Sequence, residues 1–325
     1  MPRIGGILLC AGYGSRLAPL TDVIPKPAIP FCGVPMAQYA RHFLEKAGLS
    51  ELGMNVHHLP DRMVQAMDGG KWLDGTRNIA ISRENDEILG TGGGAARVAR
   101  MMPECDTYII YHGDVLCAAD LSKALASHLE SGADVTLVVL PRPAEVKENV
   151  RKSLGMIGVV DHEIVCIRDW FKAGNRVESF LPRCFSGIHI VQKRVLDAIP
   201  DGENVCLVTQ IYRDMLASGT RIHAWEPDTE VFFADVGTPA TYLDAQARCL
   251  SAPGFLPRLA QGKCLSQTAD AVSSWLFGNA DIPKSLQILG NVCIHDGAAL
   301  PVSGQIHDAM FCREGGIQQD GTWIV

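Results

Sequence analysis

The amino-acid sequence predicts an α/β protein, with a mixed sheet sandwiched by helices and a short parallel β-helix after it. Two observations lead to this prediction. Over residues 1–250, short apolar runs alternate with amphipathic segments, which is the order of a sheet whose two faces are covered by helices. From Leu276 onward an aliphatic side chain returns at every sixth position, which is typical of a β-helix. We therefore expect one domain at 1–250 and a linker plus β-helix at 251–325.

The elements of the first domain follow from local patterns. The predicted strands are 5–10, 52–56, 77–82, 107–112 and 134–140, and the predicted helices are 35–48, 61–67, 93–102 and 120–131. Helix 35–48 has helical periodicity and ends at Gly48, a residue suited to a C-cap. The apolar segments 155–160 and 163–168 flank a short turn, so they predict an antiparallel pair, with another strand at 185–191. Thr238 and Pro239 suit the N-cap and first residue of a helix that runs to Leu250.

Two positions of the six-residue C-terminal repeat are occupied by apolar or small residues each time. The first series is Leu276, Ile282, Ile288, Ile294, Leu300 and Ile306, and the second, four residues after each, is Ala280, Leu286, Val292, Ala298, Gly304 and Met310. A β-helix has three six-residue segments to a turn, so about two turns fit here. The alternative is an irregular β extension. We expect this section to serve packing or an oligomer surface.

Composition narrows the function classes. The net charge of −7 argues against a nucleic-acid partner, and the 47% hydrophobic and 20% charged residues are typical of a soluble globular protein. The sequence has no signal-peptide pattern and no apolar run of about 18 residues, so we expect a cytoplasmic protein without a membrane partner. The 11 cysteines stand singly without C-x-x-C pairs, which predicts buried reduced thiols rather than disulfides or a zinc site.

A glycine loop, "GYGSRL" at 12–17, follows the first predicted strand. It has Leu17 where a dinucleotide fingerprint needs a small residue, and it lacks the G-x-x-x-x-G-K-[ST] pattern of an ATPase loop. Its distinguishing feature is positive charge, because Arg16 directly follows the glycines and Lys26 stands between two prolines. Glycine amides and a guanidinium together bind phosphate oxygens. The loop therefore predicts a phosphate site.

A second loop, "GTGGGAAR" at 90–97, satisfies the G-x-G-x-x-A pattern of a dinucleotide-binding fold. Asp114 lies near the distance expected for an acid that binds a ribose hydroxyl. This loop supports an NAD-dependent oxidoreductase as an alternative. That alternative leaves the first glycine loop without a role.

Two predicted strands end in aspartates, Asp114 in "YIIYHGDV" and Asp235 in "VFFADVGTP". Acids at the carboxyl ends of strands face the crevice where open α/β sheets bind ligands, and two of them can share one Mg²⁺ that bridges phosphate oxygens. The alternative role for each is a helix cap. His57 and His58 point to opposite faces of a strand and are not expected to chelate one ion, while His112 is expected to brace the Asp114 turn.

The stretch "LCAGYGSRLAPLTDVIPKPAIPFCGVPM" resembles the signature of the sugar-1-phosphate nucleotidylyltransferases, whose pattern is GGxGxRLxPLTxxxPKPxxP. The agreement continues through "LGTGGG", "HGDV", "FSGIHI" and "DVGTPATYLDA", so it covers residues 4–250. The resemblance implies a Rossmann-like nucleotidyltransferase fold. With an appended left-handed β-helix, the layout is similar to that of mannose-1-phosphate guanylyltransferases. Parts of the first domain also resemble N-acetylmuramate-1-phosphate uridylyltransferases, which usually lack the appendage.

The resemblance implies that a sugar-1-phosphate oxygen attacks the α-phosphorus of a nucleoside triphosphate and releases pyrophosphate. The implied nucleotide-binding residues are Leu9, Cys10, Ala11, Gly12, Gly14, Ser15, Arg16, Gly90, Thr91 and Gly92. Arg16, Lys26 and Asp114 would be catalytic, with Lys26 stabilising charge on the α-phosphoryl group, and Asp114 and Asp235 would hold Mg²⁺. Such a reaction needs mainly positioning and electrostatic stabilisation.

The implied sugar-phosphate side departs from the family pattern. Gly158, Ser186 and Gly187 would face the sugar. The family usually shows "EKP" after its central strands, and its lysine contacts the sugar phosphate. Here "CIRDWFKAG" offers Arg168 and Lys172 without that motif, so either of these two would take the phosphate.

The resemblance orders the candidate functions. We expect GTP and mannose-1-phosphate as substrates, with uridylyl or other nucleotidyl transfer to N-acetylmuramate-1-phosphate or another sugar phosphate as an alternative. A catalytically silent, sugar-nucleotide-sensing subunit is a further alternative. Such a subunit would be expected to lack the arginine, the lysine or an aspartate, but the sequence keeps Arg16, Lys26, Asp114 and Asp235. A homo-oligomer formed through the β-helix is the expected assembly.

Overall fold

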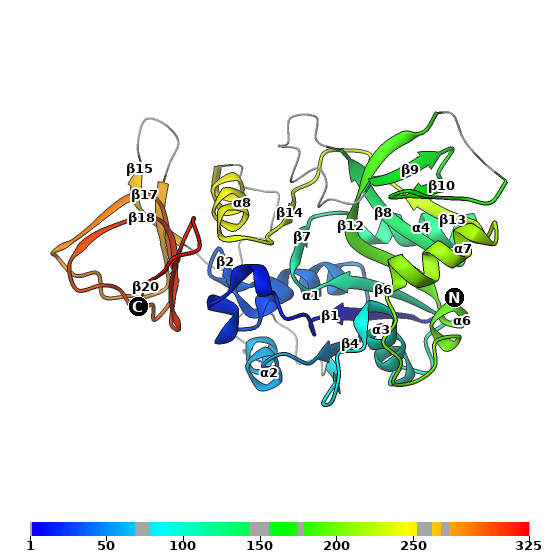
Figure 1. Cartoon of the computed structure of the whole chain (residues 1–325), viewed down its shortest axis with the longest axis horizontal. Helices are drawn as coiled ribbons and strands as arrows, with labels where there is room; N and C mark the ends of the chain where they lie inside the picture. The colour runs from blue at the N-terminus through cyan, green and yellow to red at the C-terminus, as the bar shows by residue number, and fades with distance from the viewer. Residues whose placement is uncertain are drawn as a thin grey trace.

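The computed structural model describes residues 2–68, 79–142, 156–174, 179–251, 262–267 and 273–324. An α/β body occupies most of the molecule, and a separate β sheet lies at one end, beside helix α8 (Figure 1). The body ends with α8 (Pro239–Ser251), and the strands from residue 262 onward belong to the separate sheet.

A mixed sheet forms the centre of the body. Its strand order is β11-β10-β13-β8-β12-β6-β1-β4-β5, and β9 pairs with β10 and β12 off this path. The strands are β1 (Ile4–Leu9), β4 (Glu51–Val56), β5 (Ile79–Arg83), β6 (Thr107–His112), β8 (Val135–Pro141), β9 (Met156–Val160), β10 (Glu163–Ile167), β11 (Trp170–Phe171), β12 (Leu181–Gln192) and β13 (Ile222–Trp225). The first four pair in parallel, whereas β12 is antiparallel to both β6 and β8, which makes the sheet mixed as predicted.

Helices cover both faces of this sheet. They are α1 (Met36–Lys46), α2 (Pro60–Asp68), α3 (Gly90–Arg100), α4 (Leu121–Ser131), α6 (Lys193–Asp197), α7 (Arg213–Ala217) and α8. Successive side chains of a strand point to opposite faces, so Leu8 packs into a core with α1, α4 and α8, while Ile7 packs into a second core with α3 and α7. No helix among the described residues is both long and apolar enough to cross a membrane.

Most predicted elements of the body lie where the sequence placed them. The antiparallel pair at 155–160 and 163–168 corresponds to β9 and β10. Helix α8 begins at Pro239, and the Thr238 hydroxyl accepts a hydrogen bond from the Thr241 amide at 3.2 Å, which confirms the predicted N-cap. The predicted strand 77–82 begins two residues outside the described part, and β5 is seen from Ile79.

The C-terminal sheet contains β15 (Gly262–Gln267), β16 (Ser273–Phe277), β17 (Leu286–Ile294), β18 (Gly304–Cys312), β19 (Gly315–Gln318) and β20 (Trp323–Ile324). Strands β16, β17 and β18 pair in parallel, and Ile288 lies opposite Ile306, three six-residue repeats further on. All six aliphatic residues of the first repeat series belong to, or pack against, one apolar cluster. The outer strands are antiparallel, so the structure shows a mixed sheet, and a left-handed β-helix remains a prediction.

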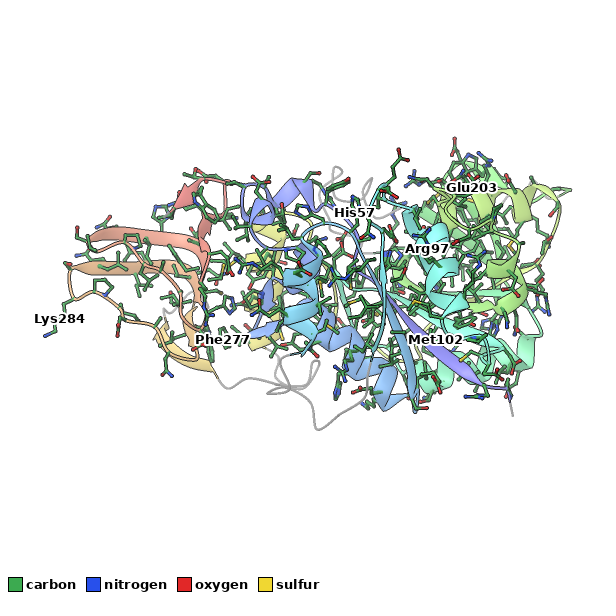
Figure 2. All side chains as sticks on the ribbon, turned by 90° about the horizontal axis from the view of Figure 1, so that it is seen from below. His57, Arg97, Met102, Glu203, Phe277 and Lys284 are labelled. Atoms are coloured by element: carbon green, nitrogen blue, oxygen red, sulfur yellow. The ribbon has the colours of Figure 1, made fainter. Side chains whose placement is uncertain are left out.

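The C-terminal sheet shares a core with the body. Phe277, Cys293 and Met310 belong to the same buried cluster as Tyr242 of α8. Phe277 lies at the inner end of the sheet and Lys284 at its outer tip (Figure 2). The cysteines whose side chains the structure describes carry free thiols, and all of them except Cys206 are buried.

Candidate active site

A cleft of about 200 Å³ lies at the carboxyl ends of β1, β4 and β6. It is lined by Leu9, Ala11, Gly12, Gly14, Lys26, Pro27, Asn55, Ile88, Gly90, Thr91, His112 and Asp114. Both glycine loops and one strand-end aspartate therefore meet in one place. This is the edge at which open α/β sheets bind ligands.

Lys26 is the charged centre of the cleft. It begins a short 3₁₀ turn, Lys26–Ala28, and is only 5% exposed. Its Nζ lies 2.7 Å from Oδ2 of Asp114 and 3.7 Å from Oδ1 of Asp235. A buried ammonium requires such partners, because its desolvation would otherwise be too costly.

A two-stranded sheet brings the two aspartates together. It pairs β7 (Val115–Cys117) with β14 (Phe233–Asp235), and in this register Asp235 lies opposite Val115, the residue that follows Asp114. Burial by itself would raise the pKa of Asp114, but the positive charge of Lys26 acts together with His112 and the hydrogen bonds to the carboxylate, and the pKa lies below its usual value. Asp114 is therefore ionised at neutral pH.

The first glycine loop is fitted closely to Lys26. Gly14 has φ +66°, and a Cβ added there would lie 2.8 Å from Cβ of Lys26, so both backbone conformation and space require glycine. Gly12 and Ser15 lie on the same loop, and Gly12 lines the cleft.

Arg16 is exposed and lies over the backbone of Gly237, where an added Cβ would come within 2.8 Å of its Cζ. Within the described residues it makes no ion pair. The guanidinium of Arg16 is therefore positioned by Gly237, which follows Asp235 by two residues in the sequence, and it is open to an anion.

The second glycine loop does not cradle a dinucleotide. Its glycines form the first turn of α3, and the amide of Gly92 donates a hydrogen bond to the carbonyl of Val205 at 2.7 Å. A Cβ on Gly90 would lie 2.7 Å from that same carbonyl. The hydroxyl of Thr91 accepts from the amide of Leu207 at 2.9 Å. The glycines thus admit the 203–205 backbone, and the Gly92 amide that a pyrophosphate would need is already bonded.

A buried network that the sequence analysis missed joins the two loops. Glu84 is 2% exposed, and its carboxylate accepts from the amide of Leu89 at 2.8 Å and from Nδ2 of Asn55 at 2.7 Å. The Oδ1 of Asn55 in turn accepts from the amide of Cys10 at 2.9 Å. Asn55 lies in β4 and Glu84 directly follows β5, so polar residues at strand ends were the available signal. Cys10 is buried, as expected for a packing residue.

The histidines near the cleft have different partners. His57 contacts the hydroxyl of Tyr13 through Nε2 at 2.9 Å and the Glu84 carbonyl through Nδ1, whereas His58 contacts the Thr21 carbonyl. His112 lines the cleft, and its Nε2 lies 3.2 Å from Nε2 of His189. Burial lowers the pKa of His112, so it is neutral at neutral pH.

The five predicted sugar-phosphate residues are spread over β9 to β12. Gly187 adjoins the cleft, because a Cβ there would meet Val115 at 3.1 Å and His112 at 3.4 Å. The buried hydroxyl of Ser186 donates to the Val138 carbonyl at 2.7 Å.

The other three lie on the β9-β10-β11 segment. Gly158 lies in β9, where an added Cβ would meet Phe180 at 2.9 Å. Arg168 follows β10 at φ +57° and lies 6.0 Å from the Trp170 ring, and Lys172 is ion-paired with Glu163. None of the five predicted residues lines the cleft as far as the structure describes the chain.

Asp114 and Asp235 fit a Mg²⁺ ion as two carboxylate ligands. The part of the chain that the structure describes contains no cluster of three or more His, Cys, Asp or Glu side chains that would hold a metal by themselves. Mg²⁺ is commonly bound by one or two carboxylates together with water and substrate phosphates, so two carboxylates beside a phosphate site suffice.

Comparisons with known proteins agree with this geometry. The model of the nucleotidyl transferase family matches residues 5–252. The chain is 26% identical to a mannose-1-phosphate guanylyltransferase of Mycobacterium tuberculosis, over 91% of this chain and 80% of that protein. It is 29% identical to a UTP–glucose-1-phosphate uridylyltransferase of Synechocystis, over 75% of this chain and 63% of that protein.

Two solved structures share the fold. One is HddC from Yersinia pseudotuberculosis complexed with GMP-PN, with a TM-score of 0.58 and 21% identity over 76% of this chain and 99% of that one. The other is a glucose-1-phosphate thymidylyltransferase from Bacillus anthracis, described as putative, in complex with a sucrose. Its TM-score is 0.60 at 17% identity, over 79% of this chain and 98% of that one.

Proposed function

This chain belongs to the nucleotidyl transferase family, and from that premise we propose that it transfers a nucleotidyl group from a nucleoside triphosphate to a sugar-1-phosphate. The observation that carries this proposal is the buried Lys26, held between Asp114 and Asp235 beside a glycine loop. Family membership excludes the oxidoreductase alternative, and the bonded Gly92 amide agrees with that exclusion.

In the proposed reaction, a phosphate oxygen of the sugar-1-phosphate forms a bond to the α-phosphorus. The bond from that phosphorus to the oxygen of the leaving pyrophosphate breaks, and the pyrophosphate departs with the electron pair. Gly12, Gly14 and Ser15 bind the triphosphate. Arg16 binds phosphate oxygens through its fork, and Lys26 stabilises the charge that develops on the α-phosphoryl group.

Asp114 and Asp235 would hold Mg²⁺, which when bound neutralises phosphate charge and orients the reacting groups. The two carboxylates also balance the charge of the buried Lys26 ammonium, whose Nζ they contact at 2.7 and 3.7 Å. The same pair thus serves the lysine and the ion.

For substrates, we propose GTP and mannose-1-phosphate. Support comes from the alignment with the M. tuberculosis mannose-1-phosphate guanylyltransferase, which extends over 91% of this chain and so reaches into the C-terminal sheet. Uridylyl transfer, to N-acetylmuramate-1-phosphate or another sugar phosphate, is the second candidate. The uridylyltransferase of Synechocystis supports it, although the chain spans 63% of that protein.

Several finer assignments belong to the same proposal. Gly158, Ser186 and Gly187 face the sugar, and Arg168 or Lys172 takes its phosphate, for which Lys172 must leave Glu163. The C-terminal sheet forms a short left-handed β-helix and serves a homo-oligomer. The protein acts in the cytoplasm.

A substrate matrix tests the proposal. Purified protein is incubated with Mg²⁺, each of GTP, UTP, ATP and dTTP, and each of mannose-, glucose- and N-acetylmuramate-1-phosphate, and pyrophosphate release is measured. We expect the highest rate with GTP and mannose-1-phosphate. A highest rate with UTP would establish the second candidate, and no release from any pair would favour the sensing subunit.

A further inference from the structure

A second cavity lies between the body and the C-terminal sheet. Its volume, about 330 Å³, exceeds that of the cleft, and it is lined by Ile24, Ala28, Pro30, Gly33, Pro35, Arg62, Gln65, Ala66, His295, Asp296, Cys312, Arg313 and Glu314. The floor is mostly apolar and either buried or half-buried, whereas Arg62, Asp296 and Arg313 at the rim are exposed. An apolar floor with a few charged groups is typical of a small-molecule site.

Among the charged side chains at the rim, one arginine has no carboxylate partner among the described residues. Glu314 pairs with Arg62 at 3.4 Å, across the boundary between the two units, and Oδ1 of Asp296 accepts from the Asn279 amide at 2.9 Å. Arg313 makes no ion pair with any described residue. It lies against Gly297, where an added Cβ would come within 3.2 Å of its Nε. Its guanidinium is thus positioned and open to an anion.

The floor offers an unused acceptor. His295 is 2% exposed, and its Nε2 lies 2.9 Å from the hydroxyl of Tyr242. That hydroxyl has one proton and already faces two acceptors, the Pro30 carbonyl and Oε1 of Gln246 at 2.9 Å, so we assign the proton of the neutral His295 ring to Nε2. Burial lowers the pKa of His295 to about 3, which keeps the ring neutral. Its Nδ1 is then an acceptor without a partner among the described residues.

We propose that this cavity binds a small sugar phosphate. The phosphate would pair with Arg313, and sugar hydroxyls would donate to the carboxylates at the rim and, where the ligand displaces the floor that covers it, to the buried Nδ1 of His295. The cavity is near the lower limit of about 300 Å³ for ligand sites, so it suits a monosaccharide phosphate rather than a nucleotide sugar.

The cavity also adjoins the segment that carries Lys26. Pro27 lines the cleft, and the next residue, Ala28, lines the second cavity. The amide of Ala28 donates to the Pro25 carbonyl at 2.8 Å, and Pro25 and Pro27 restrict the backbone on either side of Lys26. A ligand against Ala28 is therefore expected to change the position of Lys26. This coupling rests on the proposed function, whereas binding itself does not.

Binding is measured by isothermal titration calorimetry of the full chain with glucose 6-phosphate and mannose 6-phosphate. Neither has the 1-phosphate that the proposed reaction consumes. We expect one saturable site, with affinity at least tenfold weaker in R313Q and unchanged in R213Q, which removes an exposed arginine from α7. Glucose and inorganic phosphate alone are each expected to bind at least tenfold more weakly than the sugar phosphates.

Three results would overturn the site: no saturable binding, binding lost in R16Q but kept in R313Q, or phosphate alone binding as tightly as the sugar phosphates. The second result would place the probe in the cleft.

The coupling is tested by measuring pyrophosphate release by the active substrate pair with and without the probe sugar phosphate. We expect at least a twofold change in kcat or KM in the wild type and none in R313Q. An unchanged rate at a saturating concentration of the probe overturns the coupling. If no substrate pair gives any turnover, that result counts against the proposed function, while calorimetry still tests whether the cavity binds the probe.

Discussion

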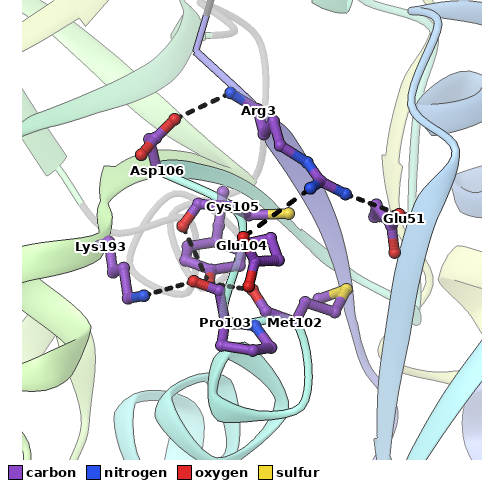
Figure 3. Close-up of polar contacts among 9 residues, drawn as sticks. Arg3, Glu51, Met102, Pro103, Glu104, Cys105, Asp106 and Lys193 are labelled. Atoms are coloured by element: carbon purple, nitrogen blue, oxygen red, sulfur yellow. Dashed lines mark hydrogen bonds and ion pairs between the residues drawn. The ribbon is translucent and has the colours of Figure 1, made fainter.

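The two ends of strand β1 each carry a cluster of opposite charges, yet only one of them has the features of a catalytic site. At the amino end, Arg3 lies between Glu51 at 3.3 Å and Glu104 at 3.9 Å, and its amide donates to Asp106 (Figure 3). At the carboxyl end, Lys26 lies between two aspartates. Both clusters therefore place one cation among several carboxylates.

The two clusters differ in how deeply the cation is buried and in whether a ligand-sized cleft adjoins it. The side chain of Arg3 is 56% exposed, so water screens its ion pairs, whereas that of Lys26 is 6% exposed. The carboxyl end also opens into a cleft with glycine loops, which admit phosphate oxygens. The number of charges thus does not identify a site, and the environment of each charge does.

The largest expected effect comes from removing the buried cation. Lys26→Ala should lower turnover at least ~100-fold, the scale of losing one strong electrostatic stabiliser of the transition state. The measurement is the initial rate of pyrophosphate release with the active substrate pair. Arg3→Ala is the matched control at the opposite edge and should change that rate by less than about twofold. A near-wild-type rate in Lys26→Ala would remove the lysine from the mechanism.

The next effect concerns the metal. Asp235→Ala should abolish stimulation by Mg²⁺, because the ion loses one of its two proposed carboxylates. Rates are measured across a Mg²⁺ titration after treatment with a chelator. Asp106→Ala, at the amino end, should leave the titration unchanged. Asp235→Ala with unchanged Mg²⁺ affinity would refute the ligand role of this residue.

A pair of glycines tests whether the fit around Lys26 matters. Gly14→Ala should slow turnover at least tenfold, because the new Cβ would lie 2.8 Å from Cβ of Lys26 and so displace it. Gly132 follows helix α4 with φ +63° and has nothing within 4 Å of an added Cβ. Gly132→Ala should cost about 1 kcal/mol of stability through backbone strain without slowing turnover. Equal rates in the two variants would contradict the role of the close fit.

Glu84 tests the network behind the loops. Glu84→Gln should raise KM for the nucleotide about tenfold and change kcat less. The carboxylate accepts from Asn55 and Leu89 through different oxygens, and the amide nitrogen that replaces one oxygen cannot accept, so one N–H is left unpaired. Steady-state kinetics separate the two constants. Glu104→Gln at the amino end should change neither. A fall in kcat at constant KM would assign Glu84 a different role.

The sequence predicted the parts of this comparison that depend on local pattern. Alternating apolar runs located the strands and helices, and the six-residue repeat located the C-terminal sheet. The charged residues Arg16, Lys26, Asp114 and Asp235 were predicted from their residue types and loop contexts, and the structure brings Lys26 into contact with both aspartates.

Long-range contacts were beyond the sequence analysis. Glu84 and Asn55 meet only because parallel pairing of β4 and β5 brings the two strand ends together. The glycines of the second loop looked like a phosphate cradle, but they admit the backbone at 203–205, which is remote in the sequence. A local sequence pattern does not show which remote segment of the backbone packs against a glycine.

The smallest expected effect lies at the amino end. Arg3→Ala should lower the free energy of unfolding by less than about 1 kcal/mol, because its ion pairs are exposed and the Arg3 amide keeps its bond to Asp106 in the variant. Chemical denaturation of Arg3→Ala, Glu51→Ala and the double variant gives the coupling between the two side chains. We expect a coupling of about 0.5 kcal/mol or less that falls as NaCl approaches 1 M, since the Debye length is then about 3 Å. A larger coupling that resists salt would mean that Arg3 is a structural anchor, and exposure would no longer separate the two ends of β1.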